Sequence, residues 1–323
     1  MKKDVIGFGA LNLDLIYKVE DEELIKQFQT GESFISEERF NRLKKILAER
    51  GKLEIKSGGG SAANTVYALA RMGFQTGYIG KLGKDEEGEF LLQSLNPVDT
   101  SRVVFGERSG TCIILVHRGD RLILVLPNSN NTLTYDEIDL HYAQETKFLH
   151  LTSFVGDLPF EAQKKLVKEM PSGAYRLSFD PGRCYAKKGL KSLLPIIEKS
   201  YIMFVNEDEV KLLTGKDYKE GSHELLTYGP KIIACKRAKK GSYVATKDEE
   251  YLIPADETVK VVDPTGAGDV YAAGFLAGLL LDLSVGKCAS LANTLAEISI
   301  TGYGREKYPN KAILEETITA IKA

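Results

Sequence analysis

The sequence predicts a doubly wound α/β fold with a mostly parallel central sheet and a small second sheet at one end. Short apolar runs alternate with amphipathic stretches in the early chain, which is the pattern of strands separated by crossover helices. Two further runs, residues 111–116 and 121–126, break this rhythm. Only residues 117–120 separate them, and Gly119-Asp120 suits a tight turn, so they predict a hairpin outside the parallel sheet.

The strands of the main sheet are expected where β-branched and aromatic residues form short apolar runs. These runs are residues 5–8, 77–80, 146–151, 174–179, 201–205 and 231–235, which supply a sheet of at least six strands. Between the first two, residues 61–72 predict a helix, because Ala62, Val66, Leu69 and Ala70 recur at helical spacing and Gly73 then ends it.

The second sheet is expected to be a lid over one end of the main sheet. Residues 11–19 and 52–56 have strand character and can join the hairpin. We find no internal repeat, low-complexity segment or Pro-rich linker, so residues 1–323 are expected to form a single domain. The interleaved lid would come from about residues 11–20, 52–57 and 108–127.

The segment of residues 21–50, between the first two lid strands, is strongly charged and helical in pattern. Leu43, Ile46 and Leu47 lie on one stripe of that pattern. We expect a solvated surface helix here.

Composition favours a protein that binds small molecules. The chain has 323 residues, with 43 Lys and Arg against 45 Asp and Glu, so no basic field attracts nucleic acid or an anionic membrane. The four cysteines contain no C-x-x-C pair, which fits a reducing cytoplasm and suggests neither disulfides nor a thiolate metal site. The longest apolar stretch, residues 272–281, is far shorter than the roughly 20 residues of a membrane span.

Familiar nucleotide-binding and zinc motifs are missing from the sequence. No G-x-x-x-x-G-K-[ST] pattern occurs. Gly7-Phe8-Gly9 follows a predicted strand, but Asn12 stands where a dinucleotide fingerprint needs its third glycine. The four histidines have no H-x-x-x-H spacing. The 30 glycines, many in pairs and triplets, are the unusual feature that remains.

The segment of residues 263–269, Asp-Pro-Thr-Gly-Ala-Gly-Asp, carries the strongest chemical signal. Pro264 is expected to end a preceding strand, and the backbone amides of Gly266, Ala267 and Gly268 together with the dipole of the following helix would form an anion site. Asp269 in its first turn could accept a proton from a substrate hydroxyl beside that site. Alternatively, Asp269 only complements the helix dipole.

Two weaker elements accompany it. Gly58, Gly59 and Gly60 precede a helix with Ser61 as expected N-cap, so a substrate could lie on bare backbone within reach of the Asn64 amide; a plain turn with a cap is the alternative. After the run 201–205, Asn206 and Glu209 form a capping-box pattern. They would also suit Mg²⁺ bound through water, since Mg²⁺ takes only one or two carboxylates.

These motifs occur in the order found in the ribokinase-like, or PfkB, family of sugar and nucleoside kinases, which the chain resembles from Gly7 to about Pro309. The resemblance implies a ribokinase-like α/β/α sandwich with a small β lid, and ATP and Mg²⁺ as cofactors. It makes Asp269 the catalytic base and the Gly266, Ala267 and Gly268 amides the anion hole. It further implies roles for residues elsewhere in the chain: Asp14, Gly59, Gly60 and Asn64 would bind sugar hydroxyls; Asn206 and Glu209 would hold Mg²⁺ and phosphate; and Lys236, Ala238, Gly241, Gly268 and Asn293 would line the nucleotide site.

The resemblance has two departures and one optional feature. Val66 stands where the family has a small or hydroxyl residue, and Arg237 and Ala238 replace the usual Leu-Gly of the nucleotide loop. Alanine adopts glycine's positive φ only at a cost. Many members of the family bind a monovalent cation, and here K⁺ would lie near Asp263 and the loop after Thr301.

The function expected from these residues is an ATP-dependent kinase that phosphorylates a hydroxymethyl group of a sugar, as ribokinases and fructokinases do. The alternative is an adenosine or nucleoside kinase, because the charged insert of residues 21–50 is similar to an insert of adenosine kinases. In favour of a sugar, Asp180-Pro181-Gly182-Arg183 resembles a segment of sugar kinases. A lower alternative is a non-catalytic sugar or nucleotide sensor. Lid strands in the family often pair between subunits, so the resemblance also implies a homodimer.

Overall fold

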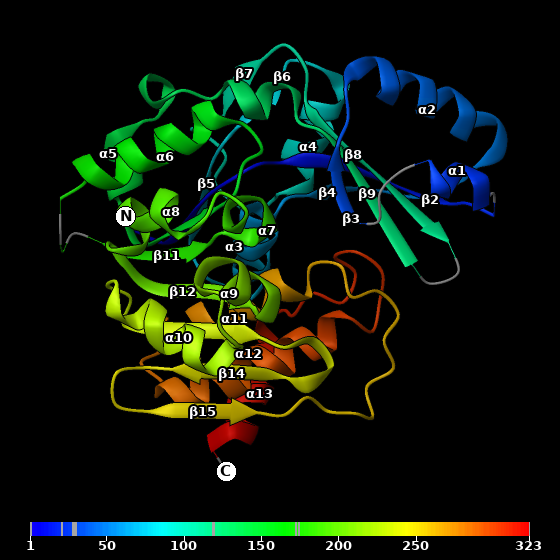
Figure 1. The fold of residues 1–323 in the computed structure, drawn as a ribbon. Coiled ribbons are helices and arrows are strands. Elements are labelled where there is room, and N and C mark those ends of the chain that lie inside the picture. Colours follow the sequence, from blue (N-terminus) through cyan, green and yellow to red (C-terminus); the bar gives the residue numbers. More distant parts are fainter. Residues whose placement is uncertain are drawn as a thin grey trace.

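An eight-stranded sheet forms the centre of the computed structural model, which describes residues 2–322 apart from 21, 28–30, 118, 119, 172 and 174 (Figure 1). In spatial order its strands are β15 (Glu250–Ile253), β14 (Ser242–Ala245), β13 (Ile232–Lys236), β12 (Ser200–Asn206), β11 (Arg176–Asp180), β10 (Thr146–Thr152), β1 (Lys3–Phe8) and β5 (Thr76–Ile79). All neighbours from β13 to β5 run parallel, and β14 and β15 add an antiparallel edge.

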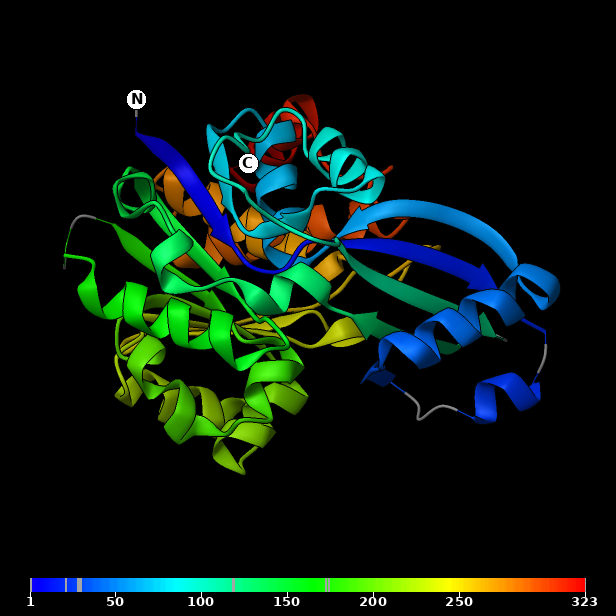
Figure 2. The ribbon, with the colours of Figure 1, turned by 90° about the horizontal axis from the view of Figure 1, so that it is seen from above.

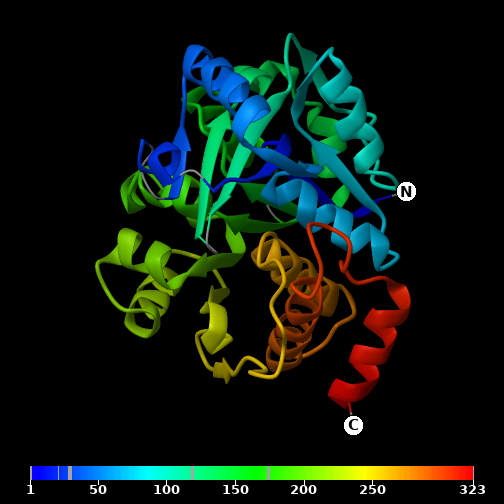
Figure 3. The same cartoon turned by 90° about the vertical axis from the view of Figure 1, so that its right-hand side faces the viewer.

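The parallel strands are apolar on both faces because helices cover both sides of the sheet. On one face lie α3 (Ser61–Arg71), α11 (Ala267–Leu280) and α12 (Val285–Ser299), with α13 (Lys311–Lys322) packed against α12. Figure 3 shows α11 to α13, in orange to red, gathered on one side. The other face carries α5 (Leu140–Gln144), α6 (Asp157–Glu169), α7 (Gly182–Ala186), α8 (Leu190–Ile197), α9 (Glu207–Thr214) and α10 (Tyr218–Thr227). The α/β sandwich expected from the sequence is therefore confirmed.

The smaller sheet has five strands and extends to the side of the larger one, as Figure 2 shows from above. Its order is β3 (Gly31–Phe34), β9 (Asp120–Leu126), β8 (Gly110–His117), β2 (Asn12–Lys18) and β4 (Lys52–Gly59). Strands β8 and β9 pair as the predicted antiparallel hairpin, but residues 118 and 119 of its predicted turn lie outside the described residues, as does residue 174 of a predicted strand.

The prediction for residues 21–50 is wrong in part. The described residues of this segment form α1 (Glu22–Lys26), strand β3 and α2 (Glu37–Arg50), instead of one surface helix. Strand β3 pairs in parallel with β9, so it completes the edge of the smaller sheet. The stripe on α2 is also a packing face, because Phe40, Leu43 and Leu47 are buried. A four-residue edge strand between charged helices leaves no periodicity in the sequence that would reveal it.

Short elements connect the two sheets. They are β6 (Lys81–Gly83) paired with β7 (Val104–Gly106), helix α4 (Glu86–Ser94), and the 3₁₀ turns Asn128–Thr132 and Tyr135–Glu137. A further 3₁₀ turn, Ala238–Lys240, joins β13 to β14 within the larger sheet. Among the helices of the described residues, none has the length and apolar character to cross a membrane.

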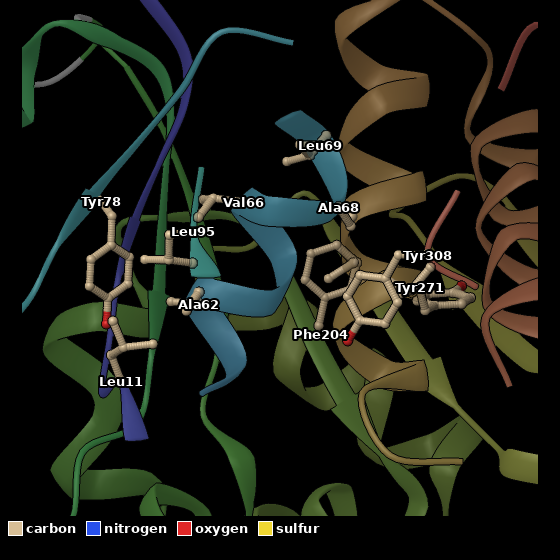
Figure 4. Packing of buried hydrophobic residues seen from close by; sticks show 14 of the residues in the cluster. Leu11, Ala62, Val66, Ala68, Leu69, Tyr78, Leu95, Phe204, Tyr271 and Tyr308 are labelled. Atoms are coloured by element: carbon tan, nitrogen blue, oxygen red, sulfur yellow. The ribbon is translucent and has the colours of Figure 1, made fainter. Parts of the chain in front are cut away.

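Helix α3 is held between the sheet and the C-terminal helices, which fixes the position of its N-terminus. Figure 4 shows Ala62 and Val66 facing the side where Leu95 and Tyr78 lie, while Ala68 faces Tyr308 on the other side. The small side chains of α3 and α11 let these helices approach closely. The N-termini of α3 and α11 therefore meet at one place.

Candidate active site

Asp269, in the first turn of α11, binds the first turn of α3. Its Oδ1 accepts a hydrogen bond from the Ser61 hydroxyl, and its Oδ2 accepts one from Asn64 Nδ2 at 2.7 Å. The Thr65 hydroxyl donates to the Asp269 backbone carbonyl at 3.2 Å. Ser61 is therefore not the N-cap that we expected. Gly60 occupies the N-cap position of α3 without a side-chain cap, and the Ser61 hydroxyl donates to Asp269 instead.

The electrostatic surroundings of Asp269 suit a proton acceptor. Loss of water around the carboxyl raises the pKa of Asp269 from 3.8 to about 6, although the hydrogen bonds from Ser61 and Asn64 oppose this rise. The neighbouring charge of Asp180 raises the pKa further, and Lys236 lowers it. A carboxyl with a pKa near 6 is ionised at neutral pH and still basic enough to take a proton in a transition state.

The turn before α11 brings the helix N-terminus to the same place. Gly266 has φ 79° and caps the helix, and a Cβ there would collide with the Tyr308 hydroxyl. The carbonyl of Gly266 accepts the N–H of Asp269 at 3.0 Å, while the Ala267 N–H turns back to the Pro264 carbonyl at 3.3 Å. The first N–H groups of a helix lack intrahelical partners, so this end of α11 suits an anion.

Pro264 does not end a strand, contrary to our prediction. The residues between β15 and α11 form a loop, in which the N–H groups of Val262 and Asp263 donate to the Ile300 carbonyl at 2.8 and 3.1 Å. Asp263 is buried, and its two carboxylate oxygens accept the N–H groups of Thr265 and Gly304 at 2.8 and 3.1 Å. Asp263 therefore ties the glycine turn to the loop after α12.

A buried ion pair lies over the first turn of α11. Lys236, at the carboxyl end of β13, donates from Nζ to Asp180 Oδ2 at 2.6 Å, and a Cβ added to Gly268 would lie 3.3 Å from that Nζ. Burial alone would lower the pKa of Lys236, but the charges of Asp180 and Glu209 outweigh it and raise the pKa. A permanent positive charge thus faces the helix N-terminus. We assigned no role to Asp180 from the sequence, because nothing local links it to Lys236.

Asn206 and Glu209 form the expected capping box at the start of α9. Asn206 Oδ1 accepts the Glu209 N–H, and Glu209 Oε2 accepts the Asn206 N–H, both at 2.9 Å. Burial, followed by the charge of Asp180, raises the pKa of Glu209. A cation in addition to Lys236 would stabilise the ionised form of this buried carboxylate. The capping box uses Glu209 Oε2 and leaves Oε1 for another ligand. The oxygen atoms of Asn206 and Glu209 therefore fit Mg²⁺ held partly through water and phosphate. The described residues contain no cluster of three acidic, His or Cys side chains around one point.

In the predicted nucleotide loop after β13, Ala238 adopts the backbone conformation that we expected to be costly for alanine. Ala238 has φ 49°, so it does adopt the positive φ for which the family uses glycine, within the 3₁₀ turn that Gly241 ends. Nearby, Asn293 Nδ2 donates to the backbone carbonyls of Ile253 and Pro254 at 3.4 and 3.2 Å. Ala238, Gly241 and Asn293 therefore lie on one side of the α11 N-terminus, around the end of β15.

Asp14 lies on the opposite side, on strand β2. A Cβ on Gly59 would collide with Asp14 Oδ2, so a larger residue there would force the Asp14 carboxylate to move. A Cβ on the next residue, Gly60, would collide with the Ala10 carbonyl oxygen, which is backbone and cannot move aside as easily. The structure thus gathers the predicted residues Asp14, Gly59 and Gly60 near Asn64.

A cavity of about 1230 Å³ opens between the smaller sheet and the loop before α11. Ile16, Ile55 and Ile114 line it from β2, β4 and β8, and Asp263 and Tyr303 line it from the other side. Because Ile16 follows Asp14 by two residues on β2, both lie on the same face of the sheet. The cavity is therefore a continuation of the Asp14 side of the site.

Arg305 is a residue of the site that sequence reasoning missed. Its Nε donates to Asn64 Oδ1 at 3.0 Å and its Nη1 to the Ser94 carbonyl at 3.0 Å. Its guanidinium lies 4.8 Å from the Tyr67 ring centre. Residues 64 and 305 are 241 positions apart, so no spacing in the sequence could have paired them.

Comparisons with known proteins bear on the family and the fold of this chain. A family model described as pfkB family carbohydrate kinase matches residues 38–311. A sugar kinase of Archaeoglobus fulgidus, itself described as uncharacterized, is 40% identical over 249 residues, which cover 75% of this chain and 98% of that one. An adenosine kinase structure from Sinorhizobium meliloti aligns with a TM-score of 0.86 at 22% identity, over 98% of this chain and 99% of that one. A putative ribokinase II of E. coli, solved with ATP and Mg²⁺, aligns with a TM-score of 0.80 at 20% identity over 98% and 99% of the two chains.

Proposed function

The chain belongs to the pfkB family of carbohydrate kinases, and from that premise we propose that Asp269 is the base with which it phosphorylates a hydroxymethyl group of a sugar. It is a phosphotransferase with an alcohol group as acceptor, as its sugar kinase relative indicates. The observation that carries the assignment of the base is the position of Asp269, where two helix N-termini meet and a buried ammonium lies nearby.

In the proposed reaction the acceptor hydroxyl lies against Asp269, and its oxygen attacks the γ-phosphorus of ATP. The new O–P bond forms as the bond to the ADP oxygen breaks, and the hydroxyl proton passes to Asp269. The Gly266 and Gly268 amides and the Lys236 ammonium stabilise the negative charge on the transferring group. The Ala267 amide, which donates to the Pro264 carbonyl at 3.3 Å, would join them after leaving that carbonyl. Asp180 keeps Lys236 in place, since the two are 2.6 Å apart.

ATP would lie on the β13 side of the site. Lys236, Ala238, Gly241, Gly268 and Asn293 are the residues we propose for it, which agrees with the family's use of ATP. Mg²⁺ would be held by Asn206 and Glu209 through water, and it would neutralise charge on the phosphates.

The acceptor would lie on the other side, on Asp14, Gly59, Gly60 and Asn64. The smaller sheet would act as a lid, because its inward face lines the cavity.

We also propose that K⁺ binds beside Asp263. If K⁺ binds there, replacing K⁺ with Na⁺ in the assay buffer would lower the rate of phosphorylation.

A nucleoside is the second candidate acceptor. Beyond Asp14 the cavity wall is mixed: Ile16, Ile55 and Ile114 give it an aliphatic part, and Tyr303 faces it from the other loop. Lys18, Glu20, Glu54 and His117 add charged and polar side chains. The aliphatic part of this wall would suit a flat nucleobase. Release of ADP should be measured over a panel of free sugars and ribonucleosides. Turnover with no member of the panel, combined with tight binding of one, would favour the sensor alternative.

Assembly and location are also proposals. A homodimer formed through the lid would bring the exposed edge of β3 or β4 against a second copy, since edge strands present unpaired backbone groups. Light scattering would distinguish a monomer from a dimer.

A cytoplasmic location is supported by the cysteine pattern.

A further inference from the structure

Arg305 makes contacts that connect it to the proposed base. Within the described part of the chain its two hydrogen bonds go to uncharged oxygens, Asn64 Oδ1 and the Ser94 carbonyl, both at 3.0 Å. Its Nη2 is buried and has no hydrogen-bond partner there. Taking a guanidinium out of water without a directly paired carboxylate is costly. The buried charge of Arg305 is offset when it stabilises ionised groups nearby, and Asp14 and Asp269 are such groups.

The amide of Asn64 lies between this cation and Asp269. Because Arg305 donates to Oδ1, the amide must present Nδ2 on its other side, and there Nδ2 donates to Asp269 Oδ2 at 2.7 Å. A rotated amide would lose the bond to Arg305 and would turn its oxygen toward a carboxylate. Arg305 therefore fixes the orientation of Asn64. Hydrogen bonds connected in this way also polarise one another.

Several charged or titratable groups face Asp269 from the elements packed around it, so Arg305 does not act alone. They are Asp180 from β11, Lys236 from β13, Tyr308 and Arg305 from the loop after α12, and, near Arg305, Asp14 from β2. Lys236 is engaged by Asp180 at 2.6 Å. Arg305 is the cation that reaches Asp269 through a single side chain.

We propose that Arg305 is a positioning residue which, through Asn64, holds Asp269 ionised and correctly oriented for proton transfer. This inference rests on the proposed role of Asp269 as base. It assigns Arg305 no contact with substrate. The purpose of the buried guanidinium is to keep the carboxylate charged at neutral pH in a site that favours its protonated form.

The pH profile of activity tests this proposal. Arg305→Met keeps most of the side-chain volume and removes the charge, so the acid limb of kcat/KM should move upward by about one pH unit. Arg305→Lys keeps the charge and should restore part of that shift. Lys307→Met removes an exposed charge from the same loop and serves as the control, with an unchanged profile. An acid limb that stays in place in Arg305→Met, with only the melting temperature lowered, would overturn the proposal in favour of a structural role.

A measurement without substrate separates this inference from the proposed function. The difference in unfolding free energy between the chain with Asp269 and its Asp269→Asn variant changes with pH around the pKa of Asp269. We expect Arg305→Met to move that pH dependence upward even if no acceptor has been found. The shift should be clearly smaller in an Asn64→Ala background, because contacts in one network are not additive. Equal shifts in both backgrounds would refute action through Asn64.

Discussion

Replacing Asp269 with asparagine should remove most of the activity and at the same time stabilise the unliganded fold at alkaline pH. Asparagine can keep both hydrogen bonds, because its oxygen accepts from Asn64 Nδ2 and its amide donates to the Ser61 hydroxyl. The side chain therefore stays in place and only the charge is lost. Without a base, kcat should fall by about 10²-fold or more.

The size of the stabilisation follows from the pKa of Asp269. That pKa is about 6 in the folded chain against 3.8 in the unfolded chain, so folding disfavours the ionised form. Each pKa unit corresponds to about 1.4 kcal/mol, which gives an upper limit of about 3 kcal/mol at pH 8. Asparagine makes weaker, uncharged hydrogen bonds, so we expect a gain of about 1–2 kcal/mol.

The sign reverses the usual case for carboxylates. A raised folded pKa means that the folded state binds the proton more tightly, so the stability contributed by Asp269 is fully present below pH 4 and is lost as the pH rises through 6. The advantage of Asp269→Asn should thus appear at pH 8, shrink below pH 6 and vanish near pH 4. Denaturant unfolding at these three pH values, without ligands, measures it. An Asp269→Asn chain that is less stable at pH 8, or whose advantage does not change with pH, would refute the reasoning.

Three other changes test the rest of the site. Lys236→Met removes the ammonium beside α11, so kcat should fall by roughly 10²-fold and KM for ATP should rise; unchanged steady-state constants would exclude Lys236 from the phosphate site. Glu209→Gln keeps the cap, since a glutamine oxygen also accepts the Asn206 N–H, so the melting temperature should hold while half-maximal activity needs more Mg²⁺. An unchanged Mg²⁺ requirement would contradict the metal assignment. Gly266→Ala places a Cβ at φ 79° against the Tyr308 hydroxyl and should cost about 1–3 kcal/mol of stability. Tyr308→Phe should restore part of that loss, and no restoration would assign the whole cost to the backbone.

Features that depend on neighbours in the chain could be predicted from the sequence. The six expected parallel strands, the β8–β9 hairpin and the capping box of Asn206 and Glu209 all follow from local patterns, and all are present. The glycine turn before Asp269 also leads into a helix as expected. Predictions from local patterns were wrong where a feature depends on a partner far away in the sequence. Strand β3 forms only by pairing with the edge of β9, and the Ser61 hydroxyl binds Asp269 instead of capping its own helix.

The sequence by itself determined the fold class, the order of the motifs and the residue types that a phosphotransferase needs. The tertiary structure alone decided which of them act on one another. Asp180 and Lys236 are 56 positions apart, and Asn64 and Asp269 are 205 apart. They meet because parallel strands end at one edge of the sheet and because α3 and α11 pack side by side. Strand order and helix packing are set by the whole core, so no local spacing in the chain encodes these contacts.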